Sequence, residues 1–428
     1  MSGKPAQSAA SATSHGTPLV QVTGLPVLGH HAFQGLAGDI VETVSPCTEA
    51  HPAALLGALI VGFGCAVGRG PHFTASGTRH FCNENFVIVG RSSRARKSTA
   101  VGNTRSILET VGILPPTASG LSSGEGLIEA IRDGRPNARR DDDDDDVDLG
   151  VEDKRLLITE EEFARTLVAM HRPGNTLSTI LRLGFDGQPW RSLTLNNKGL
   201  TCAEPHPCLI GCITAEELCK RLGEIDAMNG FGNRVLWALV DRPHLLPLAG
   251  DLPWAKLKPL LRRLKKAFGF ARVAGELHRT PEADELWVEL YAKFAATNYG
   301  GIVGCLTDRA EAHVLRLAML FALLDLKPDE APEISVDHLN AAVAFWNYCD
   351  ASVRSIFGAL SKHAKDVKAV LDEGKPSELS RDHIKAALGN HLWGDKLTVA
   401  LDELRREGLA DFRRVETGGR PCELWRAV

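Results

Sequence analysis

The stretch Asn85-Phe-Val-Ile-Val-Gly90-Arg-Ser-Ser-Arg-Ala-Arg-Lys97-Ser-Thr99 joins an apolar run to a basic, polar loop. A short apolar run that ends in glycine is typical of a buried strand in a parallel sheet. From Ser98 onward, apolar residues recur with helical spacing, at Val101, Ile107, Leu108 and Val111. Strand, polar loop and helix form half of an α/β unit, so the sequence predicts an α/β fold.

The polar loop has the residues that a phosphate-binding loop needs. Such a loop directs backbone N–H groups at an anion from a helix N-terminus, with a lysine for the β- and γ-phosphates and a hydroxyl for Mg²⁺. The loop departs from the usual GxxxxGK[ST] pattern, because Arg96 replaces the second glycine and Gly90 precedes Lys97 by seven positions rather than six. We expect ATP to be bound by Gly90, Arg94, Ala95, Arg96, Lys97, Ser98 and Thr99, with Ser98 or Thr99 on Mg²⁺. The alternative is a basic surface loop.

Three further apolar runs read as buried strands, over residues 154–159, 207–214 and 233–240. The first precedes a predicted helix over 160–170, and the second precedes one over 215–222. Apolar strands that alternate with helices predict a parallel sheet covered on both faces.

Polar residues at the ends of these runs are candidates for catalysis. Glu160 and Glu161 follow a strand, where one carboxylate can hold Mg²⁺ while its neighbour polarises the attacking water. Glu162 is better explained as an acidic residue in the first turn of a helix, where its charge interacts favourably with the helix dipole. Thr214 fits two roles equally, a γ-phosphate sensor and a helix N-cap. Arg234 stands at the start of the last of these strands and is either an arginine finger aimed across a subunit boundary or a surface arginine.

The remaining sequence divides the chain into five parts. We expect a disordered arm over 1–30, an N-terminal helical segment over 31–82, a core over 83–250, a helical region over 251–360 and a winged helix over 361–428. Within the core, residues 137–153 form an acidic insertion that includes six consecutive aspartates, Asp141 to Asp146. Three helices followed by strands around a Gly-Gly turn predict the winged helix.

Composition excludes several classes of protein. The 428 residues are 44% hydrophobic and 24% charged, with a net charge of −4, which excludes collagen, coiled coil and wholesale disorder. No apolar run approaches the roughly 20 residues of a membrane span, so we expect no membrane partner. The ten cysteines lack paired spacing, which favours reduced thiols and a cytoplasmic location over a disulfide framework or a zinc site.

Taken together, the motifs resemble a family of phage-, prophage- and plasmid-associated P-loop ATPases of unknown function, associated with primases and similar to replicative helicases. The matching stretches begin at Thr48, Val89, Leu156, Gly174, Ile213, Asn229 and Leu306, and the resemblance covers roughly residues 30–360. It implies a RecA/AAA+-like P-loop NTPase core that assembles as a ring on DNA, with Lys97 as the phosphate lysine and Glu160 and Glu161 as the acidic pair. In the family, Gly-Thr often follows the lysine, whereas Ser98-Thr99 follows it here.

Two regions offer DNA contacts. Residues 254–275 contain seven Lys or Arg and no acid, including Lys258, Arg262 and Lys265. Such a segment can follow a phosphate backbone, and it is equally well explained as a solvated amphipathic helix. In the predicted winged helix, which can bind DNA or protein, the candidate phosphate contacts are Lys396, Arg405, Arg413 and Arg414.

These features predict a cytoplasmic, Mg²⁺-dependent, helicase-like P-loop ATPase that acts on single-stranded or forked DNA in the replication of a mobile element. We expect a homo-oligomer, for which a hexameric ring is one arrangement, with Arg234 of a neighbour at the γ-phosphate and any priming supplied by a separate primase. One alternative is a DNA-binding regulator or adaptor that binds nucleotide without turnover. Another is the ATPase subunit of a phage-defence system.

Overall fold

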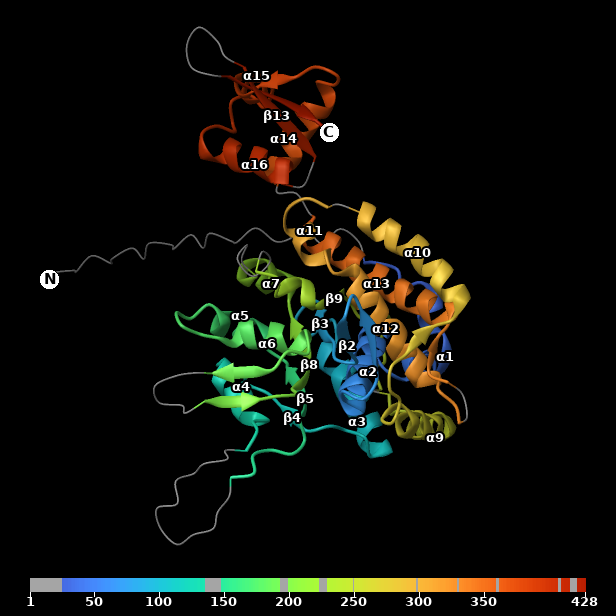
Figure 1. The fold of residues 1–428 in the computed structure, drawn as a ribbon. Coiled ribbons are helices and arrows are strands. Elements are labelled where there is room, and N and C mark those ends of the chain that lie inside the picture. The colour runs from blue at the N-terminus through green and yellow to red at the C-terminus, as the bar shows by residue number, and fades with distance from the viewer. Residues whose placement is uncertain are drawn as a thin grey trace, which may run out of the picture.

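The computed structural model describes residues 25–134, 148–192, 199–222, 229–248, 250–297, 299–328, 331–358, 362–406, 409–415 and 422–428 (Figure 1). Most of the expected disordered arm lies outside these residues, as do the aspartate run and the Gly-Gly turn. In the described part of the chain, no helix combines the length and apolarity that crossing a membrane requires.

A five-stranded, all-parallel sheet forms the centre of the fold. Its order is β4 (Thr117–Ala118), β5 (Arg155–Glu160), β8 (His206–Ile213), β3 (Asn85–Val89) and β9 (Leu236–Leu239). Every residue of β3, β8 and β9 is buried, as a sheet covered on both faces requires. The predicted α/β architecture with a parallel sheet is therefore confirmed.

Side chains of the strands alternate between two hydrophobic cores, one on each face. Phe86 and Ile88 of β3 belong to the first core, whereas Val87 and Val89 belong to the second. The first core is covered by α2 (Pro52–Val67), α3 (Lys97–Val111) and α12 (Ala310–Asp325). The second is covered by α4 (Gly124–Ala130), α5 (Phe163–Met170), α6 (Leu177–Phe185) and α7 (Ala215–Arg221).

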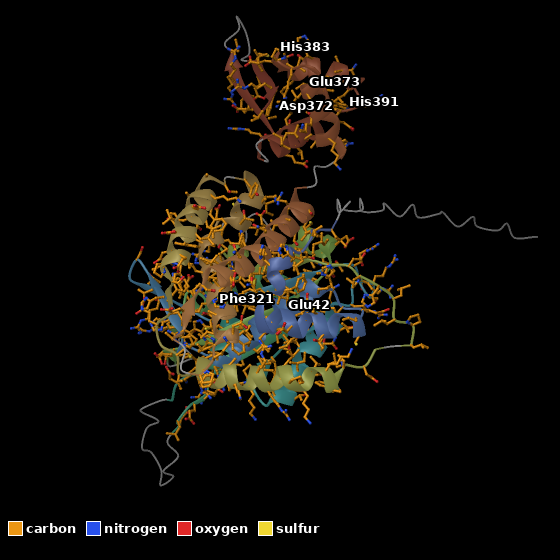
Figure 2. The ribbon with its side chains drawn as sticks, turned by 90° about the vertical axis from the view of Figure 1, so that its right-hand side faces the viewer. Glu42, Phe321, Asp372, Glu373, His383 and His391 are labelled. Carbon is orange, nitrogen blue, oxygen red and sulfur yellow. The ribbon has the colours of Figure 1, made fainter. Side chains whose placement is uncertain are left out.

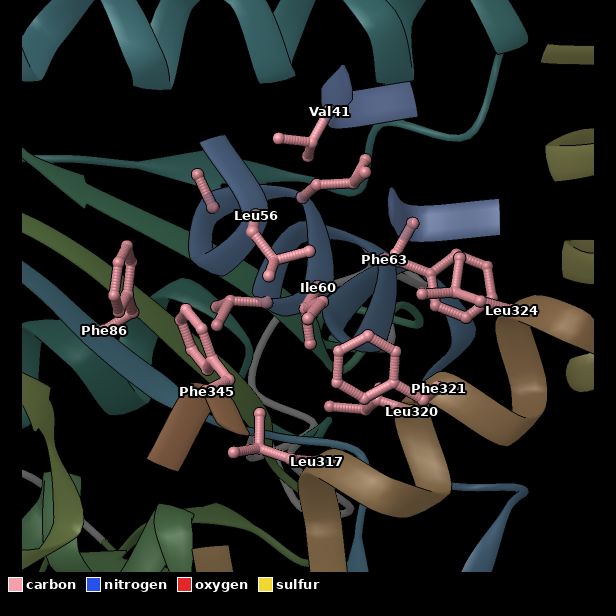
Figure 3. Packing of buried hydrophobic residues seen from close by; sticks show 14 of the residues in the cluster. Val41, Leu56, Ile60, Phe63, Phe86, Leu317, Leu320, Phe321, Leu324 and Phe345 are labelled. Carbon is pink, nitrogen blue, oxygen red and sulfur yellow. The ribbon is translucent and has the colours of Figure 1, made fainter. Parts of the chain in front are cut away.

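Helix α2 lies against the sheet because its small residues allow a close approach. A Cβ on Gly57 would lie 2.4 Å from the ring of Phe86, so only glycine fits there. Figure 3 shows Leu56 and Ile60 of this helix packed among Leu317, Leu320 and Phe321 of α12. The helical region after β9 thus shares a core with the N-terminal helices.

The predicted N-terminal segment and helical region also contain short strands. Residues 31–82 include α1 (Gly35–Val44) and the hairpin of β1 (His72–Ala75) with β2 (Thr78–Phe81). Residues 251–358 include a parallel pair, β10 (His278–Arg279) with β11 (Glu333–Ile334). Besides α12, residues 251–358 contain the helices α9 (Trp254–Ala271), α10 (Pro281–Ala296), α11 (Gly301–Thr307) and α13 (Val336–Phe357).

A second hairpin, β6 (Trp190–Ser192) with β7 (Leu200–Cys202), follows α6. Short 3-10 turns occur at η1 (His30–Phe33), η2 (Ser45–Cys47) and η3 (Gly232–Arg234).

The C-terminal residues build a core of their own around Val367, Ile384, Leu401 and Trp425. Three helices surround it, α14 (Lys362–Glu373), α15 (Arg381–Ala387) and α16 (Asp395–Arg406). The strands β12 (Leu379–Ser380), β14 (Cys422–Ala427) and β13 (Ala410–Val415) form an antiparallel sheet in that order. Three helices followed by two strands occur in the order that the sequence predicts, and β12, between α14 and α15, is an additional strand that was not predicted.

Candidate nucleotide-binding site

The carboxyl ends of the parallel strands gather the predicted site residues at one edge of the sheet. The helix that follows β3, α3, packs in the first core, whereas the helix that follows β8, α7, packs in the second. Adjacent strands whose helices leave toward opposite faces open a crevice between their carboxyl ends, which is where α/β sheets bind ligands. The loop after β3, the acidic residues after β5 and Thr214 after β8 all lie at this edge.

The loop from Gly90 to Lys97 is a compact turn tied to the neighbouring strands. The backbone N–H of Gly90 donates to Ile213 O at 3.1 Å, and the N–H of Ala95 donates to Arg91 O at 3.2 Å. A Cβ on Gly90 would lie 2.5 Å from Val240 O and 2.6 Å from the Cβ of Ala95. Glycine is therefore required at the start of this loop, because the chain turns back against β9.

Arg96 stands where the usual pattern has its second glycine, and its backbone has a conformation that glycine adopts without strain. Its φ of 52° and ψ of 36° are left-handed, a region that costs an L-residue about 1–2 kcal/mol. The side chain is anchored by an ion pair between its Nε and Glu49 Oε2 at 2.6 Å. Glu49 also accepts from the backbone N–H of Leu246 at 2.9 Å and pairs with Arg242 at 3.4 Å. The N–H of Leu246, followed by the Arg96 guanidinium, holds the pKa of Glu49 below its usual value.

Lys97 is the first residue of α3, and its side chain folds back over the loop. Its Nζ donates to Gly90 O at 2.7 Å and to Arg91 O at 3.4 Å. Burial lowers the pKa of Lys97, while Cys212, Glu217 and Glu216 act in the opposite direction. The ammonium therefore sits above the loop, in the position from which it can reach a bound anion.

The N-terminus of α3 has the features of an anion site. The side chain of Arg96, at the N-cap, accepts no hydrogen bond from the first backbone N–H groups of α3, and the first turn contains no acidic residue. Such N–H groups, together with the helix dipole, favour phosphate. Ser98 and Thr99 are exposed in this turn, and within the described residues neither hydroxyl has a hydrogen-bond partner. That one of them binds Mg²⁺, and which of the two does, both stay predictions.

The two candidate carboxylates differ in environment. Glu160 ends β5, is 7% exposed and accepts from the backbone N–H of Leu121 at 2.7 Å. Glu161 is exposed in the following turn, because the helix predicted to start at residue 160 begins only at Phe163. Burial raises the pKa of Cys212, on β8, to about 12, with Lys97 lowering it and Glu161 raising it. Cys212 thus lies within electrostatic reach of both Lys97 and Glu161.

A cleft of about 560 Å³ adjoins the acidic residues at the β4 side of this edge. Arg105 of α3, Arg165 of α5 and Arg172, just after α5, line it together with three glutamates. Its lining includes residues 119–122 and 159–162 with Arg105, Arg165 and Arg172, and Lys97 is not among the lining residues. The cleft is large enough for a small polar ligand, but no residue of the Gly90–Lys97 loop lines it.

Thr214 caps α7. Its Oγ1 accepts from the backbone N–H of Glu217 at 3.2 Å and donates to Glu217 Oε2 at 3.0 Å. The N-cap interpretation therefore matches the geometry, and the sensor role stays a prediction.

Arg234 lies at the opposite, amino-terminal edge of the sheet, because it precedes β9. It is 9% exposed, and its Nη2 pairs with Asp186 Oδ2 at 2.6 Å. Asp186 also pairs with Arg309 at 3.2 Å. Within one chain Arg234 is thus remote from Lys97, and the arginine-finger role, which requires a second copy, stays a prediction.

The basic residues of α9 and those of the C-terminal sheet have different surroundings. Lys258, Arg262 and Lys265 are exposed, and none has a carboxylate partner among the described residues. In the C-terminal sheet, Arg413 pairs with Glu378 at 2.7 Å and Arg414 with Glu423 at 3.8 Å. Arg405 lies over the ring of Phe412, 4.9 Å from its centroid, while Lys396 is exposed at the start of α16.

Sequence analysis missed the acidic residues that anchor the loop. Asp241 follows β9 and pairs with Arg91 in the loop. Burial raises the pKa of Asp241, but the hydrogen bonds from Arg91 and the N–H of Arg242 outweigh it and leave the pKa lowered. An acid directly after an apolar run was the available signal for Asp241, whereas nothing near Glu49 in sequence indicates its contact with Arg96.

The described residues contain no group of three or more His, Cys, Asp or Glu side chains arranged for a metal ion. Mg²⁺ that arrives with phosphates needs only one or two carboxylates and the phosphate oxygens, and Glu160 with Ser98 or Thr99 fits this requirement. No protein-family model matches the chain, and a search of curated proteins also finds no match. The chemistry of the site is therefore inferred from its own residues.

Proposed function

We propose that this protein binds ATP with Mg²⁺ at the carboxyl edge of its sheet and hydrolyses it, as an oligomeric, cytoplasmic, helicase-like ATPase of the RecA/AAA+ type that acts on DNA. The observation that carries the proposal is the Gly90–Lys97 loop. It turns from a buried central strand into an uncapped helix, with a left-handed residue at position 96 and the Lys97 ammonium folded over it.

Each residue of the site then has a distinct task. The N–H groups of the first turn of α3 hold the phosphates, and Lys97 exchanges Gly90 O for the β- and γ-phosphate oxygens. Ser98 or Thr99 and Glu160 would hold Mg²⁺, which neutralises phosphate charge when it is bound. Glu161, exposed beside the crevice, orients the attacking water.

An arginine supplied by a neighbouring copy would complete the site. Such a residue typically contributes 10³–10⁵ in rate. Arg234 is our candidate, and its release from Asp186 would be part of assembly. The family resemblance supports DNA as the partner and replication of a mobile element as the setting, and the C-terminal helices and antiparallel sheet support a winged helix.

A nucleotide-binding adaptor without turnover is the second candidate function. Glu160 favours it, because one oxygen of this carboxylate already accepts from Leu121 N and is partly committed to structure. The ATPase releases phosphate from ATP, whereas the adaptor binds the nucleotide without releasing phosphate.

The test measures phosphate release by malachite green, with and without single-stranded DNA, for the wild type, Glu161→Gln and Glu162→Gln. Glu162 is the matched control, because it pairs with Arg165 at 3.7 Å on the surface. We expect Mg²⁺-dependent release that DNA stimulates, that Glu161→Gln abolishes and that Glu162→Gln retains. ATP binding by the wild type without any phosphate release would favour the adaptor.

A further inference from the structure

Helix α9 carries an unusually one-sided charge. Its inner face is apolar, and Leu257, Leu261 and Leu264 are buried in the first core. Its outer face has six exposed basic residues, Lys256, Lys258, Arg262, Arg263, Lys265 and Lys266. The helix contains no acidic residue that could offset them.

Most of this charge is not neutralised by the residues that the structure describes. Among the described residues, Arg263 alone of these six has a carboxylate partner, Asp39, at 2.7 Å, and both side chains are about half exposed. Within the described residues, the other five basic side chains of this outer face have none. The arginines of the C-terminal sheet differ, because Arg413, Arg414 and Arg426 each lie near a carboxylate.

The spacing of these cations suits an extended polyanion. At 1.5 Å per residue, Lys256 and Lys266 are about 15 Å apart along the helix axis. Phosphates follow one another at about 3.4 Å per strand along the axis of a DNA duplex, so the row matches about four of them. Lys258, Arg262 and Lys265 recur at i, i+4 and i+7 and therefore share one line on the helix. Figure 2 shows α9 at the lower edge of the main body with side chains directed outward.

An anionic membrane is a poorer fit for this surface. A membrane-surface helix inserts its apolar face among the lipids, but the apolar face of α9 is already packed in the core. Helix α9 therefore has no free apolar face to insert into a membrane. Its exposed basic residues can contribute electrostatic contacts alone.

We propose that the outer face of α9 binds the phosphate backbone of nucleic acid without regard to sequence. This inference specifies the DNA-contacting surface of the function proposed above. Helix α9 also packs on α3, whose first residue is Lys97, so the two proposed sites lie on helices in contact with each other. The C-terminal arginines, which are already ion-paired, would contribute less to affinity.

Fluorescence anisotropy with a labelled single-stranded oligonucleotide, without ATP and at 50–200 mM salt, tests the inference. The variant is Lys258→Gln/Arg262→Gln/Lys265→Gln. The control is Arg221→Gln/Lys293→Gln/Lys365→Gln, which removes three exposed charges from α7, α10 and α14. Thermal melting checks that both variants are folded.

We expect the α9 variant to bind at least about tenfold more weakly, with a salt slope reduced by about 2, since each phosphate contact contributes about 0.7 on a single strand. The control should bind like the wild type. Wild-type protein that does not bind, equal slopes in wild type and α9 variant, or equal losses in variant and control would each overturn the inference, as would binding to phosphatidylserine vesicles in preference to the oligonucleotide. Because ATP is absent, this result is separate from whether the protein hydrolyses ATP.

Discussion

The guanidinium of Arg96 lies 2.6 Å from the carboxylate of Glu49, 47 residues earlier in the chain. The contact fixes the residue that stands where phosphate-binding loops usually have glycine. Arg96 is left-handed there, as Ser93 is earlier in the same loop. Arg96 thus departs from the sequence pattern, but its backbone has a conformation that a glycine would adopt without strain. The ion pair with Glu49 offsets part of the strain.

The first prediction concerns this residue. Arg96→Gly removes strain of about 1–2 kcal/mol, although the ion pair is lost, and should retain ATP affinity within about threefold. Arg96→Val, a β-branched residue in the same conformation, should weaken both ATP binding and stability. Calorimetric titration and thermal melting measure these effects. Loss of ATP binding in Arg96→Gly would mean that the guanidinium itself contacts the nucleotide.

Glu160 allows its structural and chemical roles to be separated. Glu160→Gln keeps an oxygen to accept from Leu121 N, so its free energy of unfolding should equal that of the wild type while Mg²⁺-dependent phosphate release is lost. Glu160→Ala leaves that N–H without its acceptor and should cost an additional 1–3 kcal/mol or so. Urea denaturation and phosphate release give the two readouts. Full activity in Glu160→Gln would exclude the carboxylate from the Mg²⁺ site.

Thr214 should contribute to stability through its cap on α7. Thr214→Ala is expected to lower the free energy of unfolding by about 1 kcal/mol, whereas Thr214→Ser should not change it. Chemical denaturation measures both. If Thr214→Ala unfolds like the wild type, the cap contributes nothing. A loss of turnover in folded Thr214→Ala would assign the sensor role.

His51 predicts a pH dependence of stability. Its Nδ1 accepts from Ala53 N at 3.2 Å as the cap of α2, and burial lowers its pKa to about 4, against the opposing effect of Asp241. Between pH 6.5 and 4 the unfolded chain therefore binds more protons than the folded one, so stability falls as pH falls through this window. The loss is at most about 3 kcal/mol.

The matched variant is His51→Asn, which can cap the helix without titrating. The difference in unfolding free energy between wild type and variant should grow in the variant's favour from pH 7 to pH 5. His80, whose pKa burial also lowers to about 4, titrates in both proteins and cancels in this comparison. A difference that is constant with pH would contradict a neutral His51 cap.

Much of the sheet could be predicted because its central strands are continuous apolar runs. Strands β3, β5, β8 and β9 have this pattern, since both of their faces are buried. The edge strand β4 has only two residues, Thr117 and Ala118, too few for any periodicity. The hairpin of β1 and β2 was missed because each strand has only four residues, which are mostly polar and mostly not buried, apart from Phe73 and Phe81.

The contacts that hold the candidate site could not be predicted, because they join distant segments. Arg96 with Glu49, Arg91 with Asp241 and Arg234 with Asp186 depend on how the helices pack, and local pattern carries no information about this. The sequence indicated the residue types at the strand ends. It did not indicate that Arg234 would be committed to a carboxylate at the far edge of the sheet.

Isothermal titration of ATP with Mg²⁺ into the wild type and Lys97→Ala tests the central claim most directly, with circular dichroism showing that both are folded. We predict one ATP site per chain in the wild type, and binding reduced at least about a hundredfold in Lys97→Ala. Equal ATP affinity in the two proteins, or a folded wild type that binds no ATP, would contradict the proposed site.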